Sequence, residues 1–330
     1  MATSEIVALL RRALGVCMRS IWSGLLSAVL LCGAAVPSAN AAWPDKPITI
    51  TVGFGAGGTT DVAARVVGEV LNRQLGQQVI IENKPGAGGA VAATALMKAA
   101  PDGYNLVANT STTMTFDPHA TSLAYGVDDF TYVAAIGEFP EAYIALPDKG
   151  WKTLNDALAA GKQGGLNYAS TTSIDRVVSA LIAKKSGTQL AAVPTRGGAE
   201  AVTQVMGGHV DLAYSSGAYF PQAIAGQVKV IAVLGDKRLT GIPDAPTLTE
   251  LGFDISSVNL IVFMAPKGLS ADVRDAINRA FADAAKDPKV VELMDQRNLG
   301  DIVLIGDKLT ETMQAHSARF RQMIERSKAQ

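Results

Sequence analysis

Two glycine-rich segments hold the residues of this sequence whose types and spacing point to chemistry. The first, GAGGTTD, covers Gly55–Asp61, and the second, PGAGG, covers Pro85–Gly89. Each follows an apolar run typical of a strand and precedes a run typical of a helix. A helix that begins at the edge of a sheet presents unpaired backbone N–H groups and the positive end of its dipole. The two segments together therefore predict a site for a small anion.

Two other interpretations of these glycines stay open. Glycines at strand–helix junctions also serve tight turns and close packing without any ligand. The spacing Gly55-x-Gly57 after one strand, with Glu82 at the end of the next, also mimics a dinucleotide-binding loop. In that motif a third glycine would stand where this sequence has Thr60. The pattern therefore favours an anion receptor over a nicotinamide-dependent enzyme.

Residues for catalysis or metal binding are scarce. The histidines are His119, His209 and His316, and none has a second histidine at the spacing of a metal site. The sequence has no Gly-x-Ser-x-Gly motif of a serine hydrolase. We therefore expect a protein that is not an enzyme and that holds no metal and no organic cofactor.

The first 41 residues have the pattern of a cleaved signal peptide. Three basic residues, Arg11, Arg12 and Arg19, precede the uncharged stretch 21–36, and Ala39-Asn-Ala41 supplies small residues for a peptidase. We expect cleavage after Ala41 and a periplasmic protein. Both cysteines, Cys17 and Cys32, fall within this leader, so the remaining chain has no disulfide. A net charge of −1 without basic blocks argues against nucleic acid as a partner.

The rest of the chain alternates strand-like and helix-like patterns, which predicts an α/β fold with parallel sheets covered on both faces. The pattern divides into two domains joined by two crossings, near residues 139–142 and 257–260. The first domain comprises residues 42–140 and 259–330, and the second comprises residues 141–258. In this layout we expect a ligand between the carboxyl ends of both sheets, with hinge closure around it.

The helix boundaries follow from caps and apolar spacing. The first helix has its apolar residues between Val62 and Leu75, with Thr59 or Thr60 as its cap and Gly76 as its stop. After the turn at residues 266–268 the pattern predicts two helices, 271–286 and 309–327, with a short strand at 302–305 between them. Thr153 is predicted to cap a helix that ends at Ala160.

Several segments resemble the Bug-type family, the substrate-binding proteins of tripartite tricarboxylate transporters. The resemblance covers essentially the whole chain after the leader. The segments that carry it are WPDKPI at 43–48, GGTTD at 57–61, ENKPGAGG at 82–89, APDGY at 100–104, LNYAS at 166–170, VPTRGGA at 193–199, GGHVD at 207–211 and PDAPT at 243–247.

The resemblance implies a two-domain periplasmic binding protein of the Venus-flytrap, type II-like class that works as a monomer. It implies a small mono- or dicarboxylate as ligand and the membrane permease of a tripartite transporter as partner. In the family the two glycine loops hold one carboxylate of the ligand, and loops of the second domain set specificity. The ligand-binding positions implied here are Phe54, Gly55, Ala56, Gly57, Gly58, Thr59, Thr60, Asp61, Pro85, Gly86, Ala87, Gly88, Gly89, Ser170, Thr171, Thr172, Ser173, Arg176 and Thr195.

Departures from the family pattern bear on the ligand. Asp175 and Arg176 stand where the family often has a small residue followed by histidine. Arg176 is a candidate clamp for a second carboxylate, or else a solvated arginine paired with Asp175 or Glu200. Arg196 has the same two interpretations. Ser215 replaces a second acidic residue, which argues against an amino acid as ligand.

A different class of function also fits these residues. A binding protein of this kind could present its closed form to a two-component sensor kinase instead of a permease. Genomic neighbourhood would separate the two roles, since permease genes alongside favour transport.

Overall fold

The computed structural model describes residues 43–329. The predicted signal peptide, 1–41, and its cleavage site therefore lie outside the described residues. Among the residues described, no helix has both the length and the apolar character that a membrane span needs.

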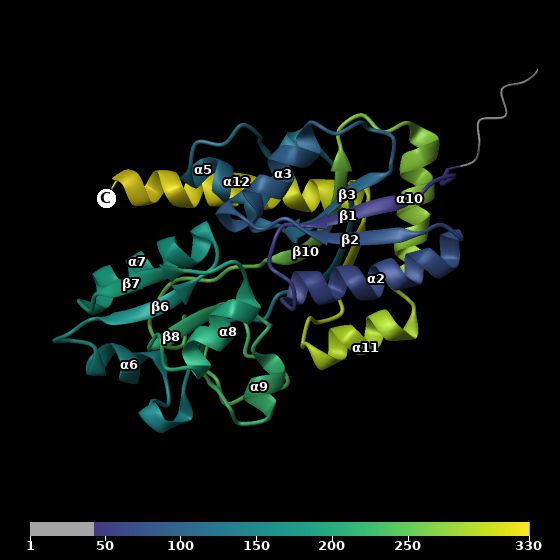
Figure 1. The fold of residues 1–330 in the computed structure, drawn as a ribbon. Coiled ribbons are helices and arrows are strands. Elements are labelled where there is room, and N and C mark those ends of the chain that lie inside the picture. The colour runs from purple at the N-terminus through teal and green to yellow at the C-terminus, as the bar shows by residue number, and fades with distance from the viewer. Residues whose placement is uncertain (1–42, 330) are drawn as a thin grey trace, which may run out of the picture. The chain divides into compact units, whose positions relative to one another are not determined.

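The chain builds two sheets (Figure 1), which we call sheet A and sheet B. Sheet A has six strands in the order β11-β4-β10-β3-β1-β2. Its strands are β1 (Ile48–Val52), β2 (Val79–Asn83), β3 (Asn105–Thr110), β4 (Phe130–Glu138), β10 (Leu260–Pro266) and β11 (Val303–Ile305). Alternate β-branched residues of β1 are buried, since Ile48, Ile50 and Val52 are at most 1% exposed.

Helices cover both faces of sheet A. On one face, α2, α10 and α11 pack around β1 and β10, and on the other α3, α4 and α12 pack around β3 and β4. The helical elements of this half are α2 (Thr59–Leu75), η1 (Ala87–Gly89), α3 (Ala90–Met97), α4 (Thr112–Thr115), α5 (Asp117–Ala120), η2 (Val127–Asp129), α10 (Ala271–Ala284), α11 (Pro288–Gln296) and α12 (Asp307–Ala329). We call sheet A with these elements the sheet A half.

Sheet B has five strands in the order β7-β6-β8-β5-β9. Its strands are β5 (Glu141–Ala145), β6 (Leu166–Ser170), β7 (Leu190–Pro194), β8 (Leu212–Ser216) and β9 (Lys229–Val233), and its helical elements are η3 (Pro147–Lys149), α6 (Leu154–Ala160), α7 (Ser173–Ser186), α8 (Gly198–Met206) and α9 (Phe220–Ile224). α6 and α7 cover one face and α8 and α9 the other. We call these elements the sheet B half.

The chain passes between the sheets twice, from β4 to β5 and from β9 to β10. A hydrogen-bond network joins the two passages, because Asn259 Nδ2 donates to Glu141 Oε1 at 2.7 Å. Asn259 Oδ1 also accepts from the Ser111 hydroxyl at 3.1 Å. These crossings lie where the sequence suggested them, while the division into two domains at residues 140/141 and 258/259 stays a prediction.

The sheets are mixed, which corrects the prediction of parallel sheets. β10 runs antiparallel to β3 and β4, and β5 runs antiparallel to β8 and β9. Both are strands that enter directly from the other sheet without a crossover helix, so nothing forces them into the parallel direction. β11 also runs antiparallel to β4. The remaining pairs, β1 with β2 and β3, and β6 with β7 and β8, are parallel.

Two helix predictions also need correction. The N-cap of α2 is Gly58, so Thr59 and Thr60 are the first helical residues and neither caps the helix. A further helix, α11, follows α10, in a segment for which the sequence pattern predicts no helix. The sequence does indicate where this helix begins, because Asp287 caps the helix and Pro288 occupies its first position. The stop of α2 at Gly76 and the cap of α6 at Thr153 are confirmed.

Candidate ligand-binding site

The first glycine segment forms a loop, Gly53–Gly58, between β1 and α2, which we call the first loop. Gly58 caps α2 without any side-chain hydrogen bond. The backbone N–H groups of Thr59 and Thr60 in the first turn find no acceptor among the described residues. They are therefore donors that the fold leaves available, at the positive end of a 17-residue helix.

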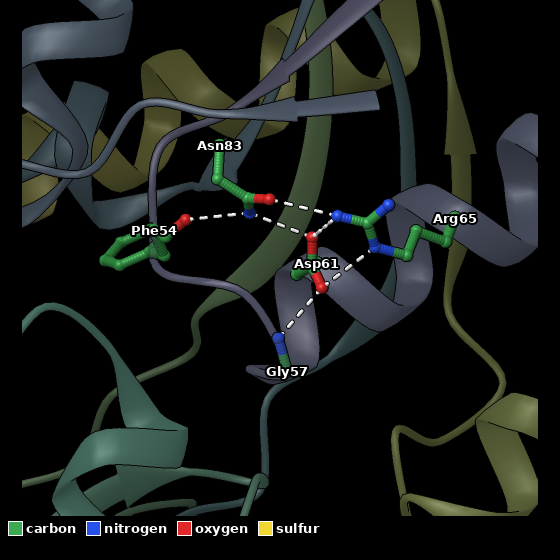
Figure 2. A network of polar contacts seen from close by, with 5 residues as sticks. All are labelled: Phe54, Gly57, Asp61, Arg65 and Asn83. Carbon is green, nitrogen blue, oxygen red and sulfur yellow. Dashed lines mark hydrogen bonds and ion pairs between the residues drawn. The ribbon is translucent and has the colours of Figure 1, made fainter. Parts of the chain in front are cut away.

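Asp61 shapes this loop (Figure 2). Its carboxylate accepts hydrogen bonds from the Gly57 N–H at 2.9 Å, from Asn83 Nδ2 at 2.8 Å and from Arg65 at 2.9 and 3.1 Å. Burial alone would raise the pKa of Asp61, but these hydrogen bonds outweigh it and lower that pKa below its usual range. Asn83 Nδ2 also donates to the Phe54 carbonyl at 3.0 Å. Asp61 and the Gly57 N–H are thus committed to the scaffold of the loop.

The second glycine segment, Pro85–Gly89, leads through η1 into α3, and we call it the second loop. Its glycines at 86, 88 and 89 have positive φ. Gly89 is needed for close approach, because an added Cβ would lie 2.3 Å from the side-chain oxygen of Asn109. Asn109 Nδ2 in turn donates to the Gly89 carbonyl at 3.1 Å. Gly89 is therefore required for packing, and its role in binding an anion stays a prediction.

Ser170–Ser173, which we call the hydroxyl loop, connects β6 to α7. Its donors converge on Asp175, whose carboxylate accepts from the Ser170 hydroxyl at 2.6 Å and from the Thr171 and Thr172 N–H groups at 2.8 and 2.7 Å. Thr172 and Asp175 form a capping box. The sequence reading treated this loop as open to ligand and missed the box, although Thr172 with Asp175 three residues later is its recognisable signal.

A second helix N-terminus lies beside that of α2. The N-cap of α8 is Gly197, and the Gly198 and Ala199 N–H groups find no acceptor among residues 43–329. A Cβ placed on Gly58 would lie 4.0 Å from the Gly198 nitrogen. The Gly55 N–H donates to the Arg196 carbonyl at 2.9 Å, so the first loop is hydrogen-bonded directly to the turn before α8.

These elements surround a small cavity of about 20 Å³, which we call the enclosed cavity for its small size, although it is about as open to solvent as the larger hollow described below. Its lining is uncharged and rich in hydroxyl groups. The lining residues are Phe54, Gly58, Thr59, Thr60, Thr110, Phe139, Thr171, Thr172, Gly198 and Ser216. The hydroxyl of the lining residue Thr59 and that of Ser215, beside Gly198, are buried without a hydrogen-bond partner among the described residues. The enclosed cavity is therefore bordered by backbone and hydroxyl donors and by no side-chain charge.

An adjoining hollow of about 190 Å³, which we call the open hollow, shares Phe54 and Thr171 with the enclosed cavity. It is lined by Gly53, Phe54, Pro85, Gly86, Ala87, Gly88, Gly89, Thr171, Thr195 and Arg196. Larger hollows, of about 340 to 550 Å³, lie at other places on the surface. We place the candidate site by its donors rather than by size.

Most of the predicted positions fall around these two spaces. Thr195 is held to the hydroxyl loop, because its hydroxyl donates to the Ser170 carbonyl at 3.0 Å and lies 3.2 Å from that of Thr171. The predicted residues that line neither space are Gly55, Ala56, Gly57, Asp61, Ser170, Ser173 and Arg176. Arg196, weighed above as a candidate clamp, lines the open hollow, and the lining residues not predicted from the sequence are Gly53, Thr110, Phe139, Gly198 and Ser216.

The two arginines differ in their placement. The guanidinium of Arg176 donates to the hydroxyls of Ser173 at 3.1 Å and Ser170 at 3.4 Å, outside both spaces. Arg196 lines the open hollow, and its Nε donates to Glu200 at 2.9 Å. Its two Nη groups find no partner among the described residues, so they are available at the rim of the hollow.

No group of three or more His, Cys, Asp or Glu side chains that could hold a metal ion occurs within residues 43–329. The donors at the candidate site are hydroxyls and backbone N–H groups, which suit an anion and are poor ligands for a cation.

Comparison with known proteins identifies the family of this chain. The family described as tripartite tricarboxylate transporter family receptor (TctC) matches residues 63–328. The chain belongs to the TctC receptor family. A UPF0065 protein of Agrobacterium vitis is 33% identical over 311 residues, which cover 91% of this chain and 88% of that protein. BugT of Bordetella pertussis is 29% identical over 290 residues, with 84% and 87% covered.

Solved structures agree with the TctC assignment. A periplasmic transporter has a TM-score of 0.79 at 28% identity, covering 87% of this chain and 98% of its own. MatC of Rhodopseudomonas palustris, solved with bound malate, has a TM-score of 0.77 at 26% identity and covers 86% and 100%. The binding protein BugD has a TM-score of 0.74 at 25% identity, covering 86% and 98%.

The TctC assignment confirms the predicted family and fold class. TctC proteins and these structural neighbours are solute-binding proteins and not enzymes, which also settles the choice against a nicotinamide-dependent enzyme. We therefore interpret the N-termini of α2 and α8 as candidate contacts for a bound solute.

Proposed function

We propose that this protein is a periplasmic receptor that binds a small organic carboxylate and delivers it to the permease of a tripartite tricarboxylate transporter. The observation that carries the proposal is the meeting of two helix N-termini, those of α2 and α8, at an uncharged, hydroxyl-lined cavity. The unpaired N–H groups of Thr59, Thr60, Gly198 and Ala199 supply donors from both sheet halves.

The donor set suits a carboxylate. A carboxylate has two oxygens with about four acceptor positions, and convergent N–H and O–H donors can satisfy them without a counter-cation. The helix dipoles add a favourable interaction of about 0.3 to 1 kcal/mol each at low ionic strength. Because the donors come from both halves, a bound carboxylate would hold the halves together, which is how hinge-closing receptors retain a ligand.

A second carboxylate of the ligand would bind at Arg196. This arginine is the one charged residue that lines the open hollow, and its Nη groups are available for a bidentate contact. The open hollow, at about 190 Å³, also limits the remainder of the ligand to a few carbon atoms. Malate, bound by the MatC structure, is a dicarboxylate of this size and is the first probe to test.

Delivery to a permease and a periplasmic location rest on the family together with the leader-like sequence of residues 1–41. The sensor role stays a less favoured alternative, since the matching family is defined by its transporter receptors.

A thermal-shift screen tests the binding proposal. The chain from Ala42 would be heated with mono-, di- and tricarboxylates, amino acids and nicotinamide cofactors. A ligand present at a hundred times its dissociation constant adds about 2.7 kcal/mol of stability, which raises the midpoint visibly. We expect a shift with small carboxylates, malate among them. A shift with nicotinamide cofactors and none with carboxylates would overturn the proposal.

Two matched pairs of variants locate the site once a carboxylate binds. Thr60→Val removes a hydroxyl at the enclosed cavity and should weaken binding about tenfold, or ~1.4 kcal/mol. Thr312→Val on α12, a half-buried residue that lines neither space, should leave affinity unchanged. Arg196→Gln should weaken a dicarboxylate more than a monocarboxylate, and Arg176→Gln should affect both alike. Equal effects within either pair would place the ligand elsewhere.

A further inference from the structure

Asp117 is a buried carboxyl group where the sheet A half contacts α7. It lies on α5, between β3 and β4 of the sheet A half, and only 3% of its surface is exposed. Ser173, the first residue of α7, lies next to its carboxyl group. A Cβ placed on Gly88 would lie 3.8 Å from Asp117 Oδ2. Asp117 therefore joins the second loop and α5 to the start of a helix in the other half.

Asp117 lies at the N-terminus of α7, where the carboxylate of Asp175 already accepts the available hydrogen bonds. Asp175, on the first turn of α7, is fully buried and accepts the hydrogen bonds of the hydroxyl loop. The protein's own acids thus occupy the N-terminus of α7, which leaves the N-termini of α2 and α8 for a ligand. A second charge beside Asp175 is unfavourable, because like charges in a buried site repel strongly.

The charged and titratable groups around Asp117 come from three elements. On α7 these are Asp175, which opposes a charge on Asp117, and Arg176, an exposed side chain that favours it. On α5 itself His119 hydrogen-bonds Ser317 of α12, and Arg321 of α12 lowers the pKa of that histidine after the larger effect of burial. Tyr125 lies close enough for the Asp117 charge to raise the pKa of its hydroxyl, which burial raises further.

We propose that Asp117 is a proton-operated latch between the sheet A half and α7, which holds them together when its carboxyl group is neutral and releases them when it is charged. The neutral carboxyl can stay buried against α7 without adding a charge next to Asp175, whereas the charged carboxyl cannot. When the two halves separate, water reaches the carboxyl and the proton leaves to solvent. Closure of the protein therefore takes up one proton at this residue.

The balance between these two states falls within the physiological range of pH. Burial is the largest effect and raises the pKa of Asp117 to about 7, against the smaller lowering by Ser173 and Arg176. Below that pH the latch is closed, and above it the closed form must carry a buried charge. The latch does not depend on which ligand binds, so it goes beyond the proposed function and can be tested without a ligand.

The test measures the distance between the two halves as pH changes. Spin labels would be attached to cysteines introduced at Lys98, after α3, and Lys184, on α7, both exposed, in a full chain whose Cys17 and Cys32 are replaced by serine. Between pH 5.5 and 8.5, with no ligand present, the separation should lengthen with a midpoint near pH 7. Asp117→Asn, which keeps a hydrogen-bonding group without a charge, should keep the short separation throughout.

Two further variants complete the test. Asp148→Asn removes an exposed acid far from the latch and should reproduce the pH response of the parent chain. Asp117→Ala, which also removes the charge, should keep the short separation at every pH. A separation that does not change with pH, or an Asp117→Asn variant that still responds to pH, would overturn the latch. A failure of carboxylate binding would appear only in the thermal-shift screen, so the two proposals can fail separately.

Discussion

Gly197 is a residue at which the two halves approach each other closely in the candidate site. A Cβ at this position would lie 3.3 Å from the Gly55 nitrogen and 3.6 Å from the Phe54 Cβ. We expect Gly197→Val to push the first loop away from the turn before α8 and to break the hydrogen bond from Gly55 to Arg196. Carboxylate affinity should fall about tenfold or more, ~1.4 kcal/mol, as measured by calorimetry with malate.

The control for this prediction is Gly164→Val, because a Cβ on Gly164 meets no atom within 4 Å. Urea unfolding should show similar stability for both variants, since the backbone of Gly197 is extended and accepts a side chain. Unchanged affinity in Gly197→Val would mean that this contact is not part of the ligand-bound form.

Asn83 holds the first loop in place through hydrogen bonds to the Phe54 carbonyl and to Asp61 (Figure 2). We expect Asn83→Ala to lower the free energy of unfolding by about 1 to 3 kcal/mol, because two acceptors lose a donor in a partly buried site. Asn72→Ala is the matched control, since its one contact, from the Val79 N–H, is exposed and long at 3.3 Å. Equal losses in urea unfolding would contradict the scaffold role of Asn83.

At the scale of elements, two capping boxes allow the effect of burial to be measured. Asp175 of α7 and Asp156 of α6 each accept two backbone N–H groups and a threonine hydroxyl at a helix start. Asp175 is fully buried and also accepts the Ser170 hydroxyl, whereas Asp156 is exposed. We expect Asp175→Ala to cost about 2 to 3 kcal/mol and Asp156→Ala about 1 kcal/mol or less, measured by urea unfolding.

If the two substitutions lower the free energy of unfolding equally, burial does not strengthen the capping box of α7. The donors of the hydroxyl loop would then be available to a ligand. The Asp175→Ala chain is then the one to test for an altered choice of carboxylate.

Local signals account for the elements that could be predicted from the sequence. Strands such as β1 and helices such as α2 follow from apolar spacing and from glycine stops a few residues apart. The direction of β5 and β10 could not be predicted, because it depends on partners far along the chain. The same reason explains the site: the donors of α8 meet those of α2 only after residues about 140 positions apart come together.

In the hydroxyl loop, by contrast, a neighbouring residue in the sequence decides which partner the donors bind. Its serine and threonine residues predicted a ligand contact, while the nearby Asp175 decided where their hydrogen bonds go. A carboxylate supplied by the chain satisfies the same donors as a carboxylate supplied by a ligand, and composition alone does not distinguish the two.

For the whole molecule, Glu141 couples the two passages between the sheets. Its Oε1 accepts from Asn259 at 2.7 Å and from the Ser216 hydroxyl at 3.3 Å, and Ser216 lines the enclosed cavity. Its second oxygen is buried without a hydrogen-bond partner. Burial raises the pKa of Glu141 to about 7, although Asn259, Tyr214 and Ser216 lower it in part.

This shift makes the stability of the whole protein depend on pH. The unfolded chain releases the Glu141 proton near pH 4.5, whereas the folded chain keeps it until about pH 7. The folded state therefore binds more protons in this range, so the stability contributed by the neutral group is lost as pH rises toward 7. Asp117 acts in the same direction, and His119 and His316, whose pKa values burial lowers, act in the opposite direction below pH 6.5.

The Glu141→Gln variant isolates the contribution of this residue to the pH dependence of the unfolding free energy. The glutamine keeps an acceptor for Asn259 and never carries a charge, so the variant should lose less stability than the parent chain between pH 5 and 8. We expect the two pH profiles of unfolding free energy to differ in slope by at least ~1.4 kcal/mol over that interval, the equivalent of one pKa unit. Parallel profiles from urea unfolding would show that Glu141 is charged in the folded protein, and its contact with Asn259 would then be an ionic one at the crossing.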